Sequence, residues 1–198
     1  NGPVTAPRSR PIALAVWLVI AGIIGWWAAY SLTMERFHLL MDPTATASCD
    51  FSPLVQCGKN LESWQGAVFG FPNPILGLAG WIAPIVVGCA ILAGARFARW
   101  FWLVFLAGMT FAFAFVVWLI GQSIFVLGTL CPWCMVTWVV TIPSFYAVLL
   151  HVIRIAGPAG WRRRAEALAG WLPLLAIVSY AVVAVLAEVR LDVLNQLF

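Results

Sequence analysis

Cysteines are the residues of this sequence best suited to chemistry, and two of them form a Cys-x-x-Cys motif. Cys131 and Cys134 lie in the strongly apolar segment GTLCPWCMVTW. Thr129 suits a helix cap and Pro132 suits the first helical turn, so both thiols are expected on one face of that turn. A helix N-terminus favours the thiolate, which is the attacking species in disulfide exchange. The motif therefore predicts a redox-active disulfide.

A second pair, Cys49 and Cys57, is separated by seven residues. A loop of this length closes at low entropic cost, and such a pair taken alone is most often structural. Beside the Cys-x-x-Cys motif it predicts a relay between two disulfides. A purely structural disulfide and a four-cysteine zinc site are the alternatives, because structural zinc takes four ligands; we expect no bound metal. The fifth cysteine, Cys89, is interpreted as a small packing residue.

The elements that must position these thiols are apolar. The chain of 198 residues is 64% hydrophobic and 9% charged, whereas about a quarter of the residues in a soluble domain are charged. Five runs have the roughly 18 to 23 residues that cross a hydrocarbon core of about 30 Å. They are Ile12–Leu32, Pro74–Gly94, Trp100–Gly121, Leu130–Val152 and Gly170–Ala187. We therefore expect an all-α membrane protein with five transmembrane helices.

Basic residues predict the orientation of this bundle. Eight of the eleven lie on the side of the N-terminus, namely Arg8, Arg10, Arg96, Arg99, Arg154, Arg162, Arg163 and Arg164. The positive-inside rule then places the N-terminus in the cytoplasm and both cysteine pairs on the outer, oxidising side. The net charge of +4 is explained by contact with lipid, and no nucleic-acid partner is expected.

The predicted organisation has a four-helix core and one additional helix. A cytoplasmic tail spans residues 1–11, the core 12–152 with an outer loop 33–73, a basic cytoplasmic loop 153–169, and the fifth transmembrane helix with an outer tail 170–198. Within the outer loop, the segment KNLESWQGAVFGFP predicts a short amphipathic helix. Its apolar face is expected to hold Leu61, Trp64, Val68 and Phe69.

The position of the Cys-x-x-Cys motif in an apolar span requires a lipid-soluble electron partner, and a quinone is the natural hypothesis. The order of motifs is then specific: Cys-x₇-Cys, a polar helical segment, FPNPILG, and Cys-x-x-Cys. This order resembles the vitamin K epoxide reductase (VKOR) family, and in particular its bacterial branch, whose members oxidise thioredoxin-like proteins at the expense of quinone. The resemblance covers Ile12 to Val152, the four-helix core, and the fifth span looks like the extra helix of bacterial members.

The resemblance implies a role for each of the four paired cysteines. Cys49 would receive the thiol of the partner protein in a mixed disulfide. Cys57 would pass electrons on by bonding Cys131, and Cys134 would face the quinone. All four are therefore expected to be catalytic.

The resemblance also implies quinone contacts. Ser63 stands where family members carry a functional Ser or Thr, and Asn73 matches an Asn that hydrogen-bonds a quinone oxygen. From the residues alone, Asn73 could equally be a helix cap and Ser63 an ordinary loop serine. Trp138 stands where vertebrate members have a Tyr donor, a departure that weakens the expectation of vitamin K epoxide as substrate. Further candidates for the pocket wall are Phe69, Phe111 and Phe115, with Phe71 and Trp118 beside them.

The implied function is that of a membrane thiol-disulfide oxidoreductase. It would reoxidise a separate DsbA-like or thioredoxin-like periplasmic protein and pass the electrons to menaquinone or ubiquinone, in support of disulfide bond formation. The expected location is the inner (cytoplasmic) membrane, as a multi-pass protein with the active site on the outer face. Vitamin K epoxide reduction proper, purely structural disulfides and a four-cysteine metal site are the alternatives.

Overall fold

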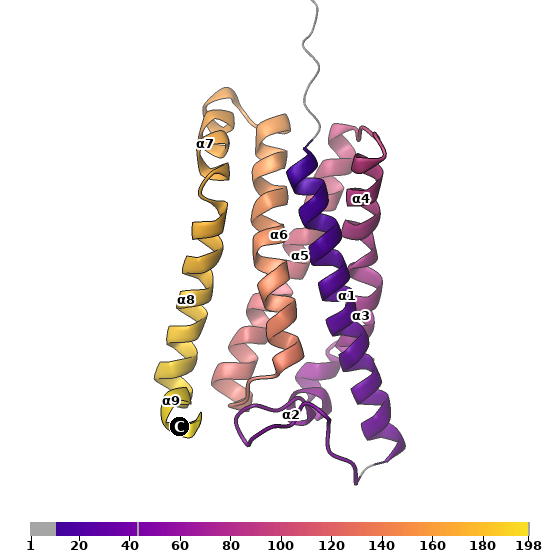
Figure 1. Ribbon diagram of the computed structural model, residues 1–198, viewed down its shortest axis with the longest axis vertical. Helices are drawn as coiled ribbons and strands as arrows, with labels where there is room; N and C mark the ends of the chain where they lie inside the picture. Colours follow the sequence, from indigo (N-terminus) through magenta and orange to yellow (C-terminus); the bar gives the residue numbers. More distant parts are fainter. Residues whose placement is uncertain (1–10, 43, 198) are drawn as a thin grey trace, which may run out of the picture.

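The computed structural model describes residues 11–42 and 44–197, so that the predicted N-terminal tail, except Pro11, lies outside the described residues. The described chain is almost entirely helical (Figure 1). Its helices are α1 (Ile12–Met41), α2 (Gly58–Glu62), the 3₁₀ turn η1 (Trp64–Ala67), α3 (Asn73–Gly80), α4 (Ile82–Leu92), α5 (Arg99–Gly121), the π-helix η2 (Gln122–Leu127), α6 (Pro132–Ala156), α7 (Ala159–Ala169), α8 (Leu172–Leu191) and α9 (Val193–Leu197).

Five segments of the described chain are long and apolar enough to cross a membrane. They are Ile12–Met41, Asn73–Leu92, Arg99–Leu127, Pro132–Ala156 and Leu172–Leu191. The predicted all-α bundle with five transmembrane helices is thereby confirmed. The second of these spans consists of two helices, because α3 ends before Trp81 and α4 begins after it. Pro84 lacks the N–H that would continue the helix through this point.

Helix α1 is longer than the predicted span Ile12–Leu32. Its 30 residues measure about 45 Å at 1.5 Å per residue, which exceeds a hydrocarbon core of about 30 Å. The C-terminal end of α1 therefore projects beyond the membrane and takes up the first part of the predicted outer loop, residues 33–41. Leu39 in this projecting part is buried against the loop that follows.

The outer loop departs from its predicted amphipathic helix. The chain forms two short turns, α2 and η1, that are separated by Ser63. Because the register changes there, the inward residues are Leu61 and Gln65, while Trp64, Val68 and Phe69 are exposed. The prediction of one short amphipathic helix was wrong, because the break at Ser63 divides the segment into two turns.

The predicted basic loop 153–169 is also largely helical. Helix α6 runs to Ala156, and α7 follows after Pro158 and packs against α6 through the buried Ala165. The helix carries the three consecutive arginines Arg162, Arg163 and Arg164 on exposed positions. Figure 1 shows α7 at the end of the bundle opposite the outer loop.

Helix α1 is the centre of the packing, in contact with α3, α4 and α6, while α5 and α8 pack against α6. Helices α1 and α4 approach closely, because a Cβ on Gly88 would lie only 2.6 Å from the backbone oxygen of Ala15. Cys49, Cys57 and Cys131 belong to a buried apolar cluster at the outer-loop end, with Leu32, Leu39 and Leu61. They are therefore part of the packed core.

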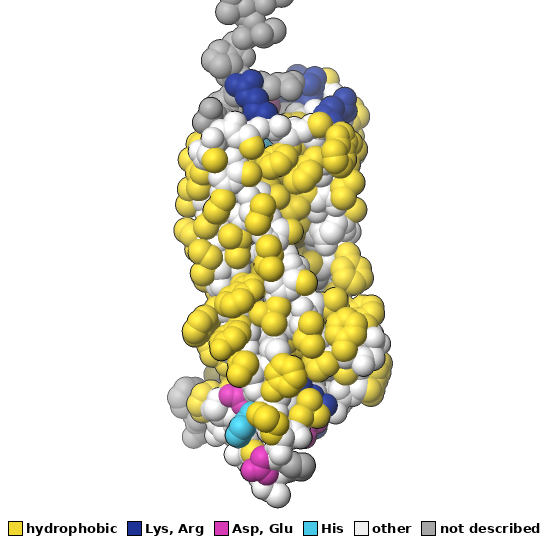
Figure 2. All heavy atoms as spheres, turned by 90° about the vertical axis from the view of Figure 1, so that its right-hand side faces the viewer, with side chains coloured by type: hydrophobic (Ala, Val, Ile, Leu, Met, Phe, Trp, Pro, Cys, Tyr) yellow, Lys and Arg dark blue, Asp and Glu magenta, His cyan; other side chains and the backbone are white. Residues whose placement is uncertain are grey.

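The charged side chains are divided between the two ends of the bundle. Figure 2 shows a broad band of hydrophobic side chains, a group of Lys and Arg at one end, and acidic side chains and a His at the other end, where some Lys or Arg also lie. The acidic residues of the outer-loop end are Glu35, Asp42, Asp50, Glu62, Glu188 and Asp192. The apolar band is the surface that a membrane would cover, since exposed apolar area on this scale is not tolerated in water.

Candidate redox site

The four paired cysteines meet at the outer-loop end of the bundle. Cys49 and Cys57 form a disulfide. The sulfur of Cys131 lies 3.4 Å from the sulfur of Cys57, and Cys131 and Cys134 are both free thiols. Cys57 and Cys131 have no exposed surface and Cys49 is 4% exposed. A thiol in this position is within reach of the neighbouring disulfide, so that exchange between the pairs needs only a small displacement.

A short backbone pairing brings the two pairs together. Val55 and Leu130 form an isolated parallel bridge. The amide of Leu130 donates to the carbonyl of Leu54 at 2.8 Å, and the amide of Gln56 donates to the carbonyl of Leu130 at 3.1 Å. Cys57 and Cys131 follow directly after these paired residues, so that the bridge sets their register against each other.

Two carboxylates anchor the disulfide loop to its surroundings. Asp50 Oδ1 accepts hydrogen bonds from the amides of Cys57 at 2.7 Å and Gly58 at 2.9 Å. Glu35 on α1 accepts from both the amide and the hydroxyl of Ser48, next to Cys49. The backbone on both sides of the disulfide is therefore held by contacts that do not depend on the S–S bond.

The Cys-x-x-Cys motif opens α6, as its sequence predicts. Pro132 occupies the first helical turn, but the cap is Cys131 and not Thr129, since the Cys131 sulfur accepts from the amide of Cys134 at 3.4 Å. Thr129 instead accepts a hydrogen bond from the side chain of Asn60. The prediction of a Thr129 cap was wrong because that hydroxyl is bonded to the outer loop.

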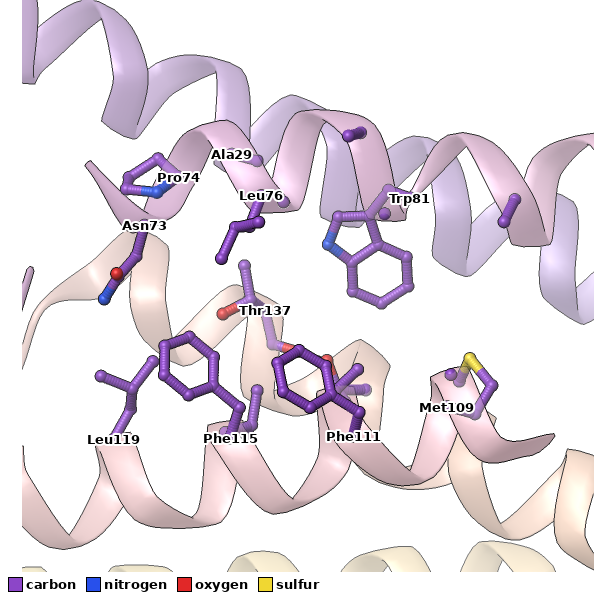
Figure 3. A pocket seen from close by; sticks show the side chains of 18 of the residues that line it. Ala29, Asn73, Pro74, Leu76, Trp81, Met109, Phe111, Phe115, Leu119 and Thr137 are labelled. Carbon is purple, nitrogen blue, oxygen red and sulfur yellow. The ribbon is translucent and has the colours of Figure 1, made fainter. Parts of the chain in front are cut away.

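A cavity of about 960 Å³ lies beside the motif and includes Cys134 in its wall. Figure 3 shows Leu76 and Trp81 on one side and the rings of Phe111 and Phe115 on the other. The wall residues of α5 and the start of η2 run from Phe101 to Gln122, which is about 30 Å at 1.5 Å per residue. The cavity is therefore an elongated, mostly apolar groove whose wall includes one free thiol, that of Cys134.

A comparison with known protein families then identifies the chain. The model of the vitamin K epoxide reductase family matches residues 16–149. The chain belongs to this family. A search of curated proteins found no match. Membership makes the protein a membrane oxidoreductase, and the redox chemistry of the VKOR family is linked to quinone.

Of the quinone contacts that the resemblance predicts, four line the cavity: Asn73, Phe111, Phe115 and Trp138. Phe69 lies against this wall, with its ring centroid 5.6 Å from that of Phe115. The roles of these side chains toward a quinone remain predictions.

Ser63 and Asn73 are both engaged in holding the outer loop. The Ser63 hydroxyl donates to the carbonyl of Asn60 and accepts from the amide of Gly66, which caps η1. Ser63 is not part of the cavity wall. The Asn73 amide donates to the carbonyl of Gln65 at 2.6 Å and accepts from the amide of Val68 at 3.1 Å. Both side chains therefore stabilise the fold of the outer loop through these hydrogen bonds, independently of any contact with a ligand.

Sequence reasoning did not single out a buried polar cluster between the outer loop and η2. The Asn60 side chain donates to the Thr129 hydroxyl at 3.0 Å and accepts from the Ser123 hydroxyl at 3.1 Å. All three side chains are buried. The polar pair Gln122 and Ser123 at the end of an apolar span was the available signal, because polar residues inside membrane spans usually have a specific role.

Other features lie outside this site. Trp138 also lines a second pocket of about 360 Å³ between α6 and α8. Cys89 is exposed on α4, so its interpretation as a buried packing residue was wrong. Within residues 11–42 and 44–197, no group of three or more His, Cys, Asp or Glu side chains is placed to hold a metal ion.

Proposed function

We propose that this VKOR-family protein reoxidises a thioredoxin-like or DsbA-like partner and transfers the electrons to a membrane quinone. One observation carries the proposal: the Cys131 sulfur lies 3.4 Å from Cys57 of the Cys49–Cys57 disulfide, while Cys134 of the same motif lines the apolar cavity. The four sulfurs thus connect the outer loop to a groove that suits a lipid-soluble molecule.

The first stage oxidises the partner. A thiolate of the reduced partner attacks the Cys49 sulfur, which breaks the Cys49–Cys57 bond, forms a mixed disulfide and releases the Cys57 thiolate. The second thiolate of the partner then attacks its own sulfur in the mixed disulfide. The partner leaves with a new disulfide, and Cys49 and Cys57 are both reduced. Each step exchanges one S–S bond for another and needs a thiolate as the attacking group.

The second stage moves the electron pair inward. The Cys57 thiolate attacks Cys131 of an oxidised Cys131–Cys134 pair, which forms Cys57–Cys131 and releases the Cys134 thiolate. Cys49 then attacks Cys57, which restores the Cys49–Cys57 disulfide and releases the Cys131 thiolate. The arrangement of one disulfide and two free thiols in the structure corresponds to the end of this stage.

The third stage returns the Cys131–Cys134 pair to its disulfide. The two thiols give up two electrons and two protons, which a quinone accepts to leave as quinol. The chain's contribution is to place Cys134 in the cavity wall, to exclude water with apolar side chains, and to hold Cys131 next to Cys134 through the helix start. A volume of about 960 Å³ and a length of about 30 Å fit a ring with a long apolar tail.

The charge distribution supports an orientation for this electron path. The arginine-bearing end with α7 would face the cytoplasm and the cysteine end the outer, oxidising compartment, as expected for a multi-pass protein of the inner (cytoplasmic) membrane. The partner would then approach the acidic outer-loop end from the periplasmic side.

The test is turnover by the purified protein in lipid vesicles. A reduced thioredoxin-like protein is added with a short-chain menaquinone or ubiquinone, and both partner disulfide and quinol are measured. We expect one quinol per partner disulfide in the wild-type protein. The Cys49→Ala variant should lose partner oxidation but retain reaction of its Cys-x-x-Cys pair with quinone. The proposal would be refuted if quinol formed while the oxidation state of all four paired cysteines stayed unchanged. It would also be refuted if a protein with all four thiols intact formed no quinol.

The alternatives are separated in the same preparation. Peptide mapping after partial reduction would show the Cys57–Cys131 disulfide if the pairs exchange, whereas structural disulfides would retain a single pairing. Vitamin K epoxide supplied in place of quinone tests epoxide reduction, and metal analysis tests a four-cysteine metal site.

A further inference from the structure

Polar side chains are concentrated in one part of the cavity, toward the end of the bundle that holds the cysteines. They come from the outer loop, from the start of η2 and from α6: Asn60, Gln65, Asn73, Gln122, Ser123 and Thr137, with Thr141 one turn further along α6. A ligand with a polar head and an apolar tail would place its head here. The hydrogen bonds of these side chains decide which of them are available to it.

Most of these side chains already have partners. Thr137 and Thr141 each donate at 2.7 Å to a backbone carbonyl of the preceding turn. Asn60 and Ser123 bond each other, and the amide of Asn73 bonds the backbone through both its nitrogen and its oxygen. A ligand that used the Asn60 and Ser123 groups would have to break the bonds that hold the outer loop in place.

Gln65 and Gln122 differ from this pattern. Gln65 Nε2 donates to Gln122 Oε1 at 3.3 Å, which uses one group from each amide. In the part of the chain that the structure describes, Gln122 Nε2 and Gln65 Oε1 have no hydrogen-bond partner. Gln65 is only 3% exposed. Neither atom is among the buried unpaired ones of the described residues, and Gln122 is only partly buried, so both are accessible from the cavity that the two residues line. A free donor beside a free acceptor in an apolar cavity suits a polar ligand.

Two irregular elements bring these amides together. Gln65 belongs to the 3₁₀ turn η1, and Gln122 opens the π-helix η2 within the membrane-spanning segment Arg99–Leu127. Short π-helical stretches often occur at functional sites, and polar side chains within a membrane span are costly without a specific role. Both observations favour a functional explanation of the pair over packing.

We propose that the Gln65–Gln122 amide pair binds one oxygen of the quinone ring. The inference rests on the proposed quinone reduction and names the residues that hold the ring. Gln122 Nε2–H donates to the quinone carbonyl oxygen. After two electrons and two protons have passed from the Cys131 and Cys134 thiols, the same oxygen is a hydroxyl that donates to Gln65 Oε1. One amide pair thus serves both redox states, because it offers a donor and an acceptor side by side.

The pair also compensates for the aromatic residue at position 138. The indole of Trp138 offers one N–H donor and no acceptor, so it cannot accept a bond from the quinol hydroxyl. The amide oxygen of Gln65 supplies the acceptor that Trp138 lacks.

The test replaces Gln122 by Met, which has a similar length but neither the donor nor the acceptor. Phe125→Leu is the matched control, since Phe125 belongs to the same π-helix but is exposed on the outside of the bundle. Two quantities are measured with a short-chain menaquinone and with decylubiquinone. The first is the infrared carbonyl stretch of isotope-labelled quinone bound to the protein, and the second is the separate effect on KM and kcat.

In Gln122→Met we expect the carbonyl stretch to move toward its value in an apolar solvent. KM for quinone should rise about tenfold, as for the loss of one or two hydrogen bonds, while exchange between Cys57 and Cys131 stays at the wild-type rate. Phe125→Leu should match the wild type in the carbonyl stretch, in KM and in the rate of exchange between Cys57 and Cys131. If Gln122→Met does not fold, Gln122→Leu also removes the donor, introduces no ionisable group and should show the same loss of the carbonyl shift.

An unchanged carbonyl stretch and KM in a folded Gln122 variant would overturn this inference while leaving quinone reduction intact. A wild-type protein that forms no quinol would instead refute the proposed function itself. The two failures are therefore distinguished by the wild-type control.

Discussion

Replacement of Asn60 by Leu should detach the outer loop from the membrane helices. Asn60 is the central member of a buried cluster, with hydrogen bonds to the Thr129 and Ser123 hydroxyls. Leu has a similar volume but neither bond. The substitution thus leaves two hydroxyls buried without the partner that each has in the native protein.

The loss in docking free energy follows from the number of hydrogen bonds that the substitution removes. Each hydrogen bond contributes about 1 kcal/mol net, and a buried polar group left without its partner costs about 1 to 3 kcal/mol. Some relaxation of the two hydroxyls is expected, so we estimate a loss of about 2 to 4 kcal/mol in docking of the α2 turn. At 1.4 kcal/mol for each factor of ten, the docked population relative to the undocked one falls by about 30-fold to several hundredfold. The transmembrane helices are unaffected, so this is a local opening and not global unfolding.

The assay is the rate at which Cys57 and Cys131 form a disulfide. In a Cys49→Ala, Cys134→Ala background these are the two paired cysteines that remain, and mild oxidation followed by mass mapping measures their approach. Asn60→Leu should slow the reaction, and the reduction approaches about 30-fold when the undocked state becomes the more populated one. Glu62→Leu is the matched control, because Glu62 is exposed on the same turn α2.

A rescue variant separates lost contacts from general damage. Ser123→Ala and Thr129→Val, combined with Asn60→Leu, remove the unpaired hydroxyls and should restore most of the rate, because an apolar cluster of similar shape carries no desolvation penalty. A wild-type rate in Asn60→Leu, or a combined variant slower than the single one, would refute the reasoning.

Three further outcomes are expected. Cys134→Ser should abolish quinol formation while the outer-loop disulfide still forms, as measured by thiol mapping beside a quinone assay; residual turnover would contradict the assigned role. Cys49→Ala should prevent formation of a mixed disulfide with the partner, which non-reducing electrophoresis detects. Gly25→Ala should lower stability by about 1 to 3 kcal/mol, because its Cβ would overlap the ring of Trp81 and push that ring into the cavity. Gly121→Ala, where a Cβ meets nothing within 4 Å, is the control in a thermal-unfolding measurement.

The arrangement of helices could be predicted from the sequence because apolar length is a strong and local signal. The five spans were found, but their ends were not. Helix α1 continues past Leu32 because Leu39 packs on the outer loop and Glu35 bonds Ser48, and both contacts join residues of the helix to residues far along the chain. Helix α7 was missed because its many charges suggested a loop, whereas its stability comes from packing on α6.

Only part of the candidate site could be predicted from the sequence. Cysteine spacing and order indicated all four sulfurs, since each pair is visible as a local motif. The contacts that bring the pairs together were not visible, because the Val55–Leu130 bridge and the Asn60 cluster join segments that are about 70 residues apart. The break at Ser63 was not visible in the sequence either. It turns Gln65 inward and Trp64 outward, against the helical periodicity on which the prediction relied.

The start of α6 explains why a reactive thiol pair stands beside lipid. Cys131 caps the helix with its sulfur turned toward Cys57, and Cys134, within the first turn, lies in the wall of the cavity. A transmembrane helix offers such a position only at its end, where one neighbour is an extramembrane loop and the next is the apolar groove. In the proposed relay, an electron pair that enters from the loop therefore reaches Cys134 when Cys57 bonds Cys131 and the Cys131–Cys134 bond within this single helical turn breaks. Displacement of the pair by one turn into the span would bury both sulfurs away from the loop, and the exchange with Cys57 would be lost.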